Sequence, residues 1–247
     1  MALGLGLLSA IVLSISPAFS YEIKSDMAID PAFEERAAID AFLPEFKSIW
    51  LKALDRPELD YQRRAIFALT EAHRQGMPDL EETADSMSAL VSAPETHPVI
   101  RQAAALALIE FDDSSAAAAL DEAAQKHGIK MARLVEPQLA AWDYQPIRAR
   151  WTARLSDPAA SHEQKALAIE ALGAVADDTA TEPLRKLLLA SDAPADLRLA
   201  SARALGSIAD QQTVADAGRL AASSEMIDRL CAVSLLARQQ DEAAREL

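Results

Sequence analysis

The hydrophobic positions of this chain recur in nearly the same pattern about every thirty residues. Residues 165–177 read KALAIEALGAVAD, and residues 198–210 read RLASARALGSIAD. In each copy the apolar residues fall at i, i+3, i+4 and i+7, as on one face of a helix. The frame starts at positions 62, 101, 134, 165, 198 and 229. This period predicts stacked helical units, because one helix pair cannot bury its apolar face alone.

Each repeated stretch is followed by a second, shorter amphipathic segment. Acidic pairs, Asp112-Asp113 and Asp177-Asp178, precede two of these segments, where aspartate accepts hydrogen bonds from the free amides of a helix start. Gly173 and Gly206 fall near the end of the first helix, where we expect left-handed C-caps. No sustained alternating run of β-branched and aromatic residues predicts a strand. The pattern therefore predicts an all-α fold of helix pairs.

The stretch KALAIEALGAVADDTATEPLRKLL, residues 165–188, resembles a HEAT repeat of the short type named after phycobilisome lyases. It has the pattern R-x-x-A-x-x-A-L-G-x-I-x-D and a following helix with an early Pro-Leu. The resemblance is clear over 97–127 and 160–236 and weaker over 57–92 and 128–157. It implies an α-solenoid, an armadillo-like superhelix of about five full units with partial ends, and a protein-binding scaffold. It implies no catalysis, and no residues match a lyase site.

The N-terminal twenty residues predict a secretory signal peptide. They carry no charge, contain an apolar run from Leu3 to Ile15, and end in an A-x-S pattern that favours cleavage after Ser20. The alternatives are an uncleaved anchor or a misplaced start codon. We expect a periplasmic or secreted bacterial protein that is not membrane-inserted once the signal is removed. The predicted organisation is signal peptide 1–20, N-terminal helical cap 21–56 and repeat array 57–247, with units near 57–93, 97–127, 130–157, 160–192 and 193–224, and a partial unit 225–247.

Charge and cysteine content narrow the possible partners. The net charge of −14 disfavours nucleic acid, which needs a basic stripe to neutralise phosphates. The single cysteine, Cys231, excludes an intramolecular disulfide. The expected partner is a protein or peptide.

The stretch AAWDYQPIRARWTARL, residues 140–155, holds the strongest candidate for a binding site. Ile147, Trp151 and Leu155 form one helical stripe and should lie in the core. The alternative for the arginines of this stretch is ion pairing, for example with Glu136 and Asp157. The binding interpretation places the following residues on the concave face of the second helices, where they would hold a carboxylate-bearing peptide or partner helix: Trp142, Tyr144, Arg148, Arg150 and Arg154.

A second, weaker candidate lies in the next unit. Arg185 and Lys186 could extend the same binding face. The alternative is an ordinary solvated face on which Glu182 pairs with Lys186 at i, i+4.

Metal, cofactor and catalytic chemistry find no support in the sequence. The four histidines, at 73, 97, 127 and 162, are too dispersed for one metal. The acidic pairs lack the spacing of a calcium loop, and no catalytic motif occurs. We therefore expect no enzyme activity, no cofactor and no metal.

The sequence favours an exported, non-catalytic interaction scaffold. The alternative is that the chain is the repeat region of a larger secreted redox enzyme associated with cytochrome c modules, although no C-x-x-C-H occurs here. A weaker possibility is a cytoplasmic HEAT-like lyase accessory. The last residues, QQDEAAREL, either form a polar cap or lead into further chain.

Overall fold

The computed structural model describes residues 42–208 and 212–237, and these residues form helices without any strand. The predicted signal peptide at 1–20, most of the cap 21–56 and the last ten residues of the array lie outside this part. The α-helices are α1 Glu45–Leu54, α2 Leu59–Arg74, α3 Glu81–Ser92, α4 Pro98–Glu110, α5 Ala117–Lys126, α6 Ile129–Ala141, α7 Arg148–Ser156, α8 His162–Ala174, α9 Thr181–Leu189, α10 Ala195–Ile208, α11 Thr213–Ala221 and α12 Met226–Leu236.

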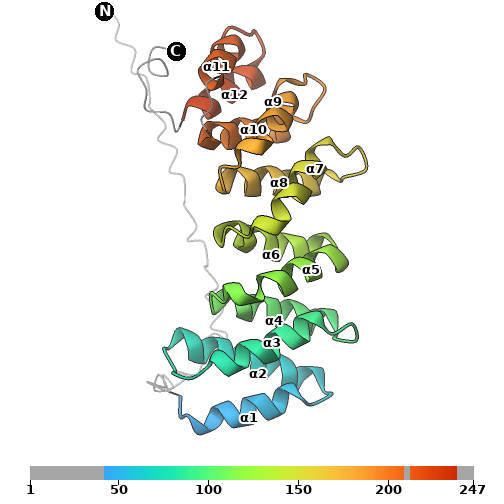
Figure 1. Cartoon of the computed structure of the whole chain (residues 1–247), viewed down its shortest axis with the longest axis vertical. Coiled ribbons are helices and arrows are strands. Elements are labelled where there is room, and N and C mark those ends of the chain that lie inside the picture. Colours follow the sequence, from blue (N-terminus) through green and yellow to red (C-terminus); the bar gives the residue numbers. More distant parts are fainter. Residues whose placement is uncertain (1–41, 209–211, 238–247) are drawn as a thin grey trace, which may run out of the picture. The chain divides into compact units, whose positions relative to one another are not determined.

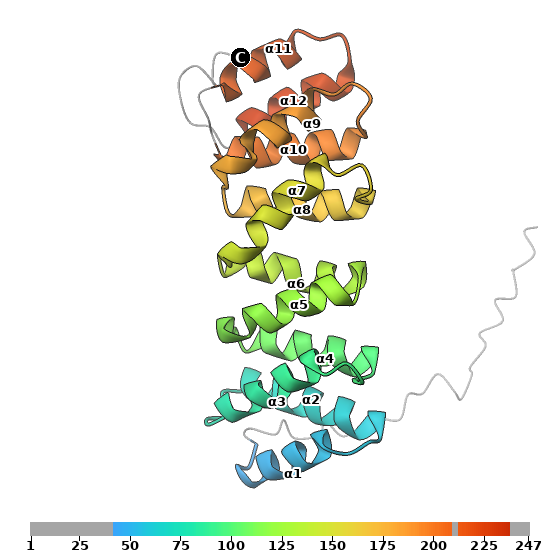
Figure 2. The same ribbon diagram turned by 45° about the vertical axis from the view of Figure 1, so that its right-hand side comes forward.

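The helices pack against their neighbours in two rows (Figures 1 and 2). Each even-numbered helix from α2 to α12 packs on the next even-numbered helix. The odd-numbered helices lie beside them, and each also packs on the even-numbered helix that follows it in the chain. The apolar core runs between the rows and includes the predicted stripe of Ile147, Trp151 and Leu155, all buried. No helix in the described ranges is long and apolar enough to cross a membrane.

Four even-numbered helices end in the same way. The residue after each helix cap has positive φ: Gly76, Asp112, Asp143 and Ala176, with φ between 48° and 75°. The next amide then donates back across the turn, for example Asp113 N to the Leu108 oxygen at 3.2 Å and Asp177 N to the Leu172 oxygen at 3.1 Å. This bond belongs to the left-handed helix ending of the Schellman type. The sharp turn returns the chain to the odd-numbered row.

The acidic pairs act partly as predicted, as helix caps. The side chains of Asp113 and Asp177 accept from the amides of Ser115 and Thr179, each two residues ahead, at 3.1 and 3.0 Å. These bonds start the short 3-10 turns at Ser114–Ala116 and Asp178–Ala180, which lead into α5 and α9. Asp112 instead takes the left-handed position, which aspartate tolerates better than most residues.

The prediction that Gly173 and Gly206 cap their helices is wrong. Both lie inside a helix, and after Gly173 the left-handed residue comes later in the turn, at Ala176. A Cβ atom on Gly173 would lie 2.8 Å from the Ala204 Cα atom, and one on Gly206 would lie 2.6 Å from the Leu235 oxygen. Glycine is needed here because successive even-numbered helices approach too closely for a side chain.

The polar residue that opens the repeat pattern ties two rows together. Arg101 Nε donates to the Val91 oxygen at 3.2 Å, and Arg198 Nε donates to the Leu188 oxygen at 2.8 Å. Gln62 makes the equivalent bond to the Leu54 oxygen at 3.0 Å. Each acceptor lies in the last turn of the preceding odd-numbered helix, where carbonyls lack helical partners. This role explains why a long polar residue recurs in an otherwise apolar frame.

Candidate functional site

Arg154, the most buried arginine of the stretch 140–155, pairs with a buried carboxylate. Its Nη1 and Nη2 atoms lie 2.7 and 2.8 Å from the two oxygens of Glu136 on α6. The indole N–H of Trp151 donates to the same carboxylate at 3.0 Å. Glu136 is 0% exposed. Three donors thus satisfy a charge that would otherwise be very costly to bury.

Arg150 and Arg148 also pair with acidic groups of neighbouring helices and turns. Arg150 forms an ion pair with Asp121, which reaches from α5 to α7. Arg148 pairs with Asp143 in its own turn and approaches Asp177 in the next turn, with its Nη1 atom 3.6 Å from the Asp177 carboxylate. These arginines therefore join adjacent units instead of standing free to bind a partner.

The two aromatic residues of the candidate site are half-buried. The indole N–H of Trp142 donates to the Asp112 carboxylate at 2.6 Å, and both Trp142 and Tyr144 pack against the core. Tyr144 follows the left-handed Asp143 and sits at the start of the next 3-10 turn. Their contacts are internal, like those of the arginines beside them.

In the next unit, Arg185 and Lys186 lie in different environments. Arg185 is buried, and its Nε atom lies 2.7 Å from Asp216 on α11. The predicted pair of Glu182 with Lys186 is wrong, because Glu182 pairs with Arg185 instead. The guanidinium lies between Glu182 and Asp216, whereas the Lys186 side chain is exposed.

The histidines and the single cysteine have structural contacts in the described ranges. In the ranges 42–208 and 212–237, no three histidine, cysteine or acidic residues are grouped to hold a metal. His162 pairs with Asp196 at 2.6 Å, and His97 accepts from the Val99 amide as a helix cap. Burial raises the pKa of the Cys231 thiol, which keeps it in the unreactive protonated form.

The sequence interpretation missed an apolar outer face on α2 and α4. Phe67 is 68% exposed and Leu106 is 46% exposed, and the two side chains border a hollow of about 220 Å³ between the helices. Leu59 and Val99 are exposed on the same two helices. We call these four residues the outer apolar patch. From Ala107 to Glu225, no large hydrophobic side chain of the described residues is exposed to this degree. Phe67 and Leu106 occupy the same place in the repeat frame, which is the signal that could have found them.

A second unrecognised feature is a cavity of about 500 Å³ at the turn edge. It lies between the turn joining α2 to α3 and the turn joining α4 to α5. Met77, Leu80 and Phe111 contribute apolar surface. Aspartates also line it, at positions 79, 85, 112 and 113. The sequence signal was an aspartate in one turn facing an acidic pair in the next.

Relatives add nothing to this geometry. A comparison of the sequence with protein-family models and with curated proteins found no match. The outer apolar patch and the acidic cavity remain as candidate sites in place of the arginine cluster, and α12 also exposes Met226, Leu230 and Val233.

Proposed function

We propose that this chain is a non-catalytic protein-interaction scaffold, an α-solenoid of HEAT-like repeats exported to the periplasm or beyond the cell. The recurring turn, the polar residue tying one row to the next and the stacking of even-numbered helices support a repeat array. The uncharged N-terminal stretch and its A-x-S pattern support export.

The outer apolar patch is the observation that carries the interaction role. Scattered single apolar residues are normal on a surface, but grouped ones mark contact sites for other proteins. Here large side chains from two packed helices flank one hollow. At the same positions of the frame, α8 and α10 carry Glu170 and Arg203, both exposed. An exposed apolar residue at this position is therefore not required by the repeat.

Affinity capture tests this role with three baits made from the exported full chain. The first is the wild type, and the second carries Phe67→Asp with Leu106→Asp. The third carries Glu170→Ala with Arg203→Ala as a matched control at equivalent positions. We expect one partner to be held by the wild type and the control but lost at least tenfold by the Asp variant, on the scale of an interface hot spot.

Circular dichroism checks that all three baits are folded. An intact mass that begins at Tyr21 checks export and cleavage. Equal capture of the same proteins by all three baits would remove the outer apolar patch as the interaction surface. An uncleaved mass from a cytoplasmic fraction would remove the exported location.

A further inference from the structure

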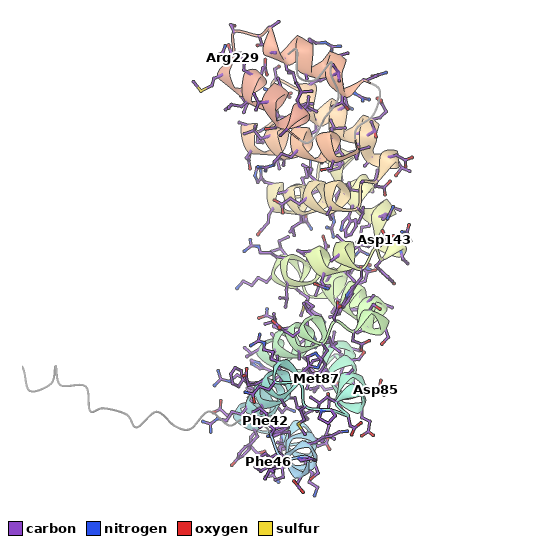
Figure 3. All side chains as sticks on the ribbon, turned by 90° about the vertical axis from the view of Figure 1, so that its left-hand side faces the viewer. Phe42, Phe46, Asp85, Met87, Asp143 and Arg229 are labelled. Carbon is purple, nitrogen blue, oxygen red and sulfur yellow. The ribbon has the colours of Figure 1, made fainter. Side chains whose placement is uncertain are left out.

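The acidic cavity at the turn edge lacks a cationic partner. Within residues 42–208 and 212–237, no ion pair involves the carboxylates of Asp79, Asp85, Asp112 or Asp113. Asp113 accepts from the Ser115 amide and hydroxyl. Asp79 and Asp85 are exposed, and Figure 3 shows the side chains of Asp85 and Asp143 projecting from the same side of the helices. The Lys47 ammonium group donates to the backbone oxygen of Asp79 and pairs with Glu82, so it lies beside the cavity without pairing with its carboxylates. The four aspartates thus retain negative charge that no ion pair of the described residues neutralises.

The walls of this cavity suit an alkyl stem as well as a charge. Met77, Leu80 and Phe111 contribute apolar surface, and the Phe111 ring lies 4.7 Å from that of His73, centroid to centroid. Arginine combines an apolar stem with a planar group that can bridge two carboxylates. A small hydrated cation would leave the apolar walls without a partner.

The chain itself fills the corresponding space two units further on. The turns can be matched by their left-handed residues, Gly76, Asp112, Asp143 and Ala176. Between the third and fourth turns, the guanidinium of Arg148 pairs with Asp143 and approaches Asp177. Between the second and third turns, the Trp142 indole donates to Asp112. At the place of Arg148 in the first unit, the sequence has a glutamate at position 81.

We propose that the acidic cavity binds an arginine side chain of a partner protein, which bridges the turns after α2 and α4 as Arg148 bridges the turns after α6 and α8. The inference rests on the proposed scaffold function, because it specifies which side chain the partner of the scaffold presents. It uses a different surface from the outer apolar patch, so the two can fail separately. The net charge of −14 would also steer a basic segment towards the chain.

Methionine methyl groups provide a direct readout in the full chain. Met77 lines the cavity, whereas Met131 is buried elsewhere and Met226 is exposed on α12. The protein is labelled with ¹³C at the methionine methyl groups and titrated at low salt with a capped Gly-Leu-Arg-Leu-Gly peptide. We expect a saturable shift of the Met77 signal and no shift of the Met131 and Met226 signals. A peptide with citrulline in place of arginine has the same shape without the charge and should give no shift.

Carboxylate variants locate the binding. Asp79→Asn with Asp85→Asn should weaken binding at least about fivefold, since charge-assisted hydrogen bonds are the stronger ones. Asparagine also tolerates the φ of 59° at position 79. The matched control is Asp178→Asn with Asp192→Asn, two exposed carboxylates outside the cavity, and it should leave the affinity unchanged.

Three results would overturn the proposal. The first is an absence of any Met77 shift, and the second is equal binding of the arginine and citrulline peptides. The third is a Met77 shift produced without peptide by Lys24→Ala with Arg36→Ala, which would assign the cavity to the chain's own N-terminal segment. Capture through the outer apolar patch would survive all three results, so failure here is distinct from failure of the scaffold function.

Discussion

The junction between α2 and α4 and the junction between α8 and α10 use the same repeat frame in opposite ways. At the first, the outer positions are Phe67 and Leu106, which are exposed, and Thr70 faces α4 across the hollow. At the second, Glu170 and Arg203 take the outer positions, and Gly173 takes the place of Thr70. Both junctions border a hollow, but the first flanks it with exposed apolar side chains, whereas at the second charged side chains flank it and the two helices approach closely at Gly173 and Ala204.

An ion pair of the first units and one of the central units differ in how deeply they are buried. In the first units, Arg74 and Glu110 form an ion pair 2.9 Å long, with side chains 50% and 38% exposed. In the central units, Arg154 meets a fully buried Glu136. Exposed pairs contribute little to stability, whereas removing one member of a buried pair leaves an uncompensated charge. Of these two pairs, loss of Arg154 should therefore destabilise the chain more than loss of Arg74.

The largest expected effect tests this ionic contrast. Arg154→Ala should lower the free energy of unfolding by about 3–5 kcal/mol, because Glu136 loses both guanidinium contacts while remaining buried. Arg74→Ala should cost less than about 1 kcal/mol. Urea unfolding followed by circular dichroism measures both. Adding Glu136→Gln to the Arg154→Ala chain should recover part of the loss, and equal costs for the two single variants would break the contrast.

An intermediate effect tests the close approach of α8 and α10. Gly173→Ala should destabilise the chain by about 1–3 kcal/mol, since its new methyl group would overlap the Ala204 backbone. Thr70→Ala, at the same place of the frame between α2 and α4, should cost about 0.5 kcal/mol. Thermal unfolding of the two variants beside the wild type provides the measurement. A neutral Gly173→Ala would mean that the helices can separate without loss.

The smallest effect uses acid to distinguish the two equivalent arginines of the frame. Arg198 pairs with Asp228, whereas Arg101 faces the imidazole of His127 at 3.5 Å. Burial, together with the charge of Arg101, lowers the pKa of His127 from its ordinary value of 6.5. Its neutral form is therefore favoured in the folded chain, and its contribution is complete above pH 6.5 and lost as the pH falls through the folded pKa.

Because His127 is exposed and solvent screens its interactions, the free energy of unfolding should change by less than about 1 kcal/mol between pH 7 and pH 5, and His127→Gln should remove this change in urea titrations. The pKa of Asp228 is lowered from 3.8 by its hydrogen bonds from Ser223 and Arg198, so the later contact should weaken only below pH 3.8. A slope that is unchanged by His127→Gln would assign it to other groups.

The sequence predicted the helices, their pairing along the chain and the buried stripe of α7, because these depend on local periodicity. It offered ion pairing with Glu136 and Asp157 as the alternative for the candidate arginines; the pair of Arg154 with Glu136 is confirmed, but the partners of Arg150 and Arg185 were missed. Their partners lie about one repeat away: Asp121 is 29 residues from Arg150, and Asp216 is 31 residues from Arg185. A search for opposite charges one period apart would have found both pairs.

The glycines show a second limit of local reasoning. A glycine near a helix end suggests a cap, but here the need for glycine comes from a neighbouring helix about thirty residues further along. After Gly173 the left-handed turn residue is Ala176, which local preference does not select first. The outer apolar patch was missed because helical spacing alone does not say which apolar residues meet a neighbour.

Packing between successive helices has a consequence for how cooperatively this chain unfolds. A helix whose substantial contacts are with its neighbours transmits a loss of structure only across the next junction. The coupling between neighbouring helices then differs from junction to junction. We expect it to be strong where α8 and α10 approach closely at Gly173, and weaker between α5 and α7, which are joined by the Arg150–Asp121 ion pair. A single melting temperature would average over these steps. Amide exchange resolved along the chain is the quantity that would assign a separate opening energy to each junction.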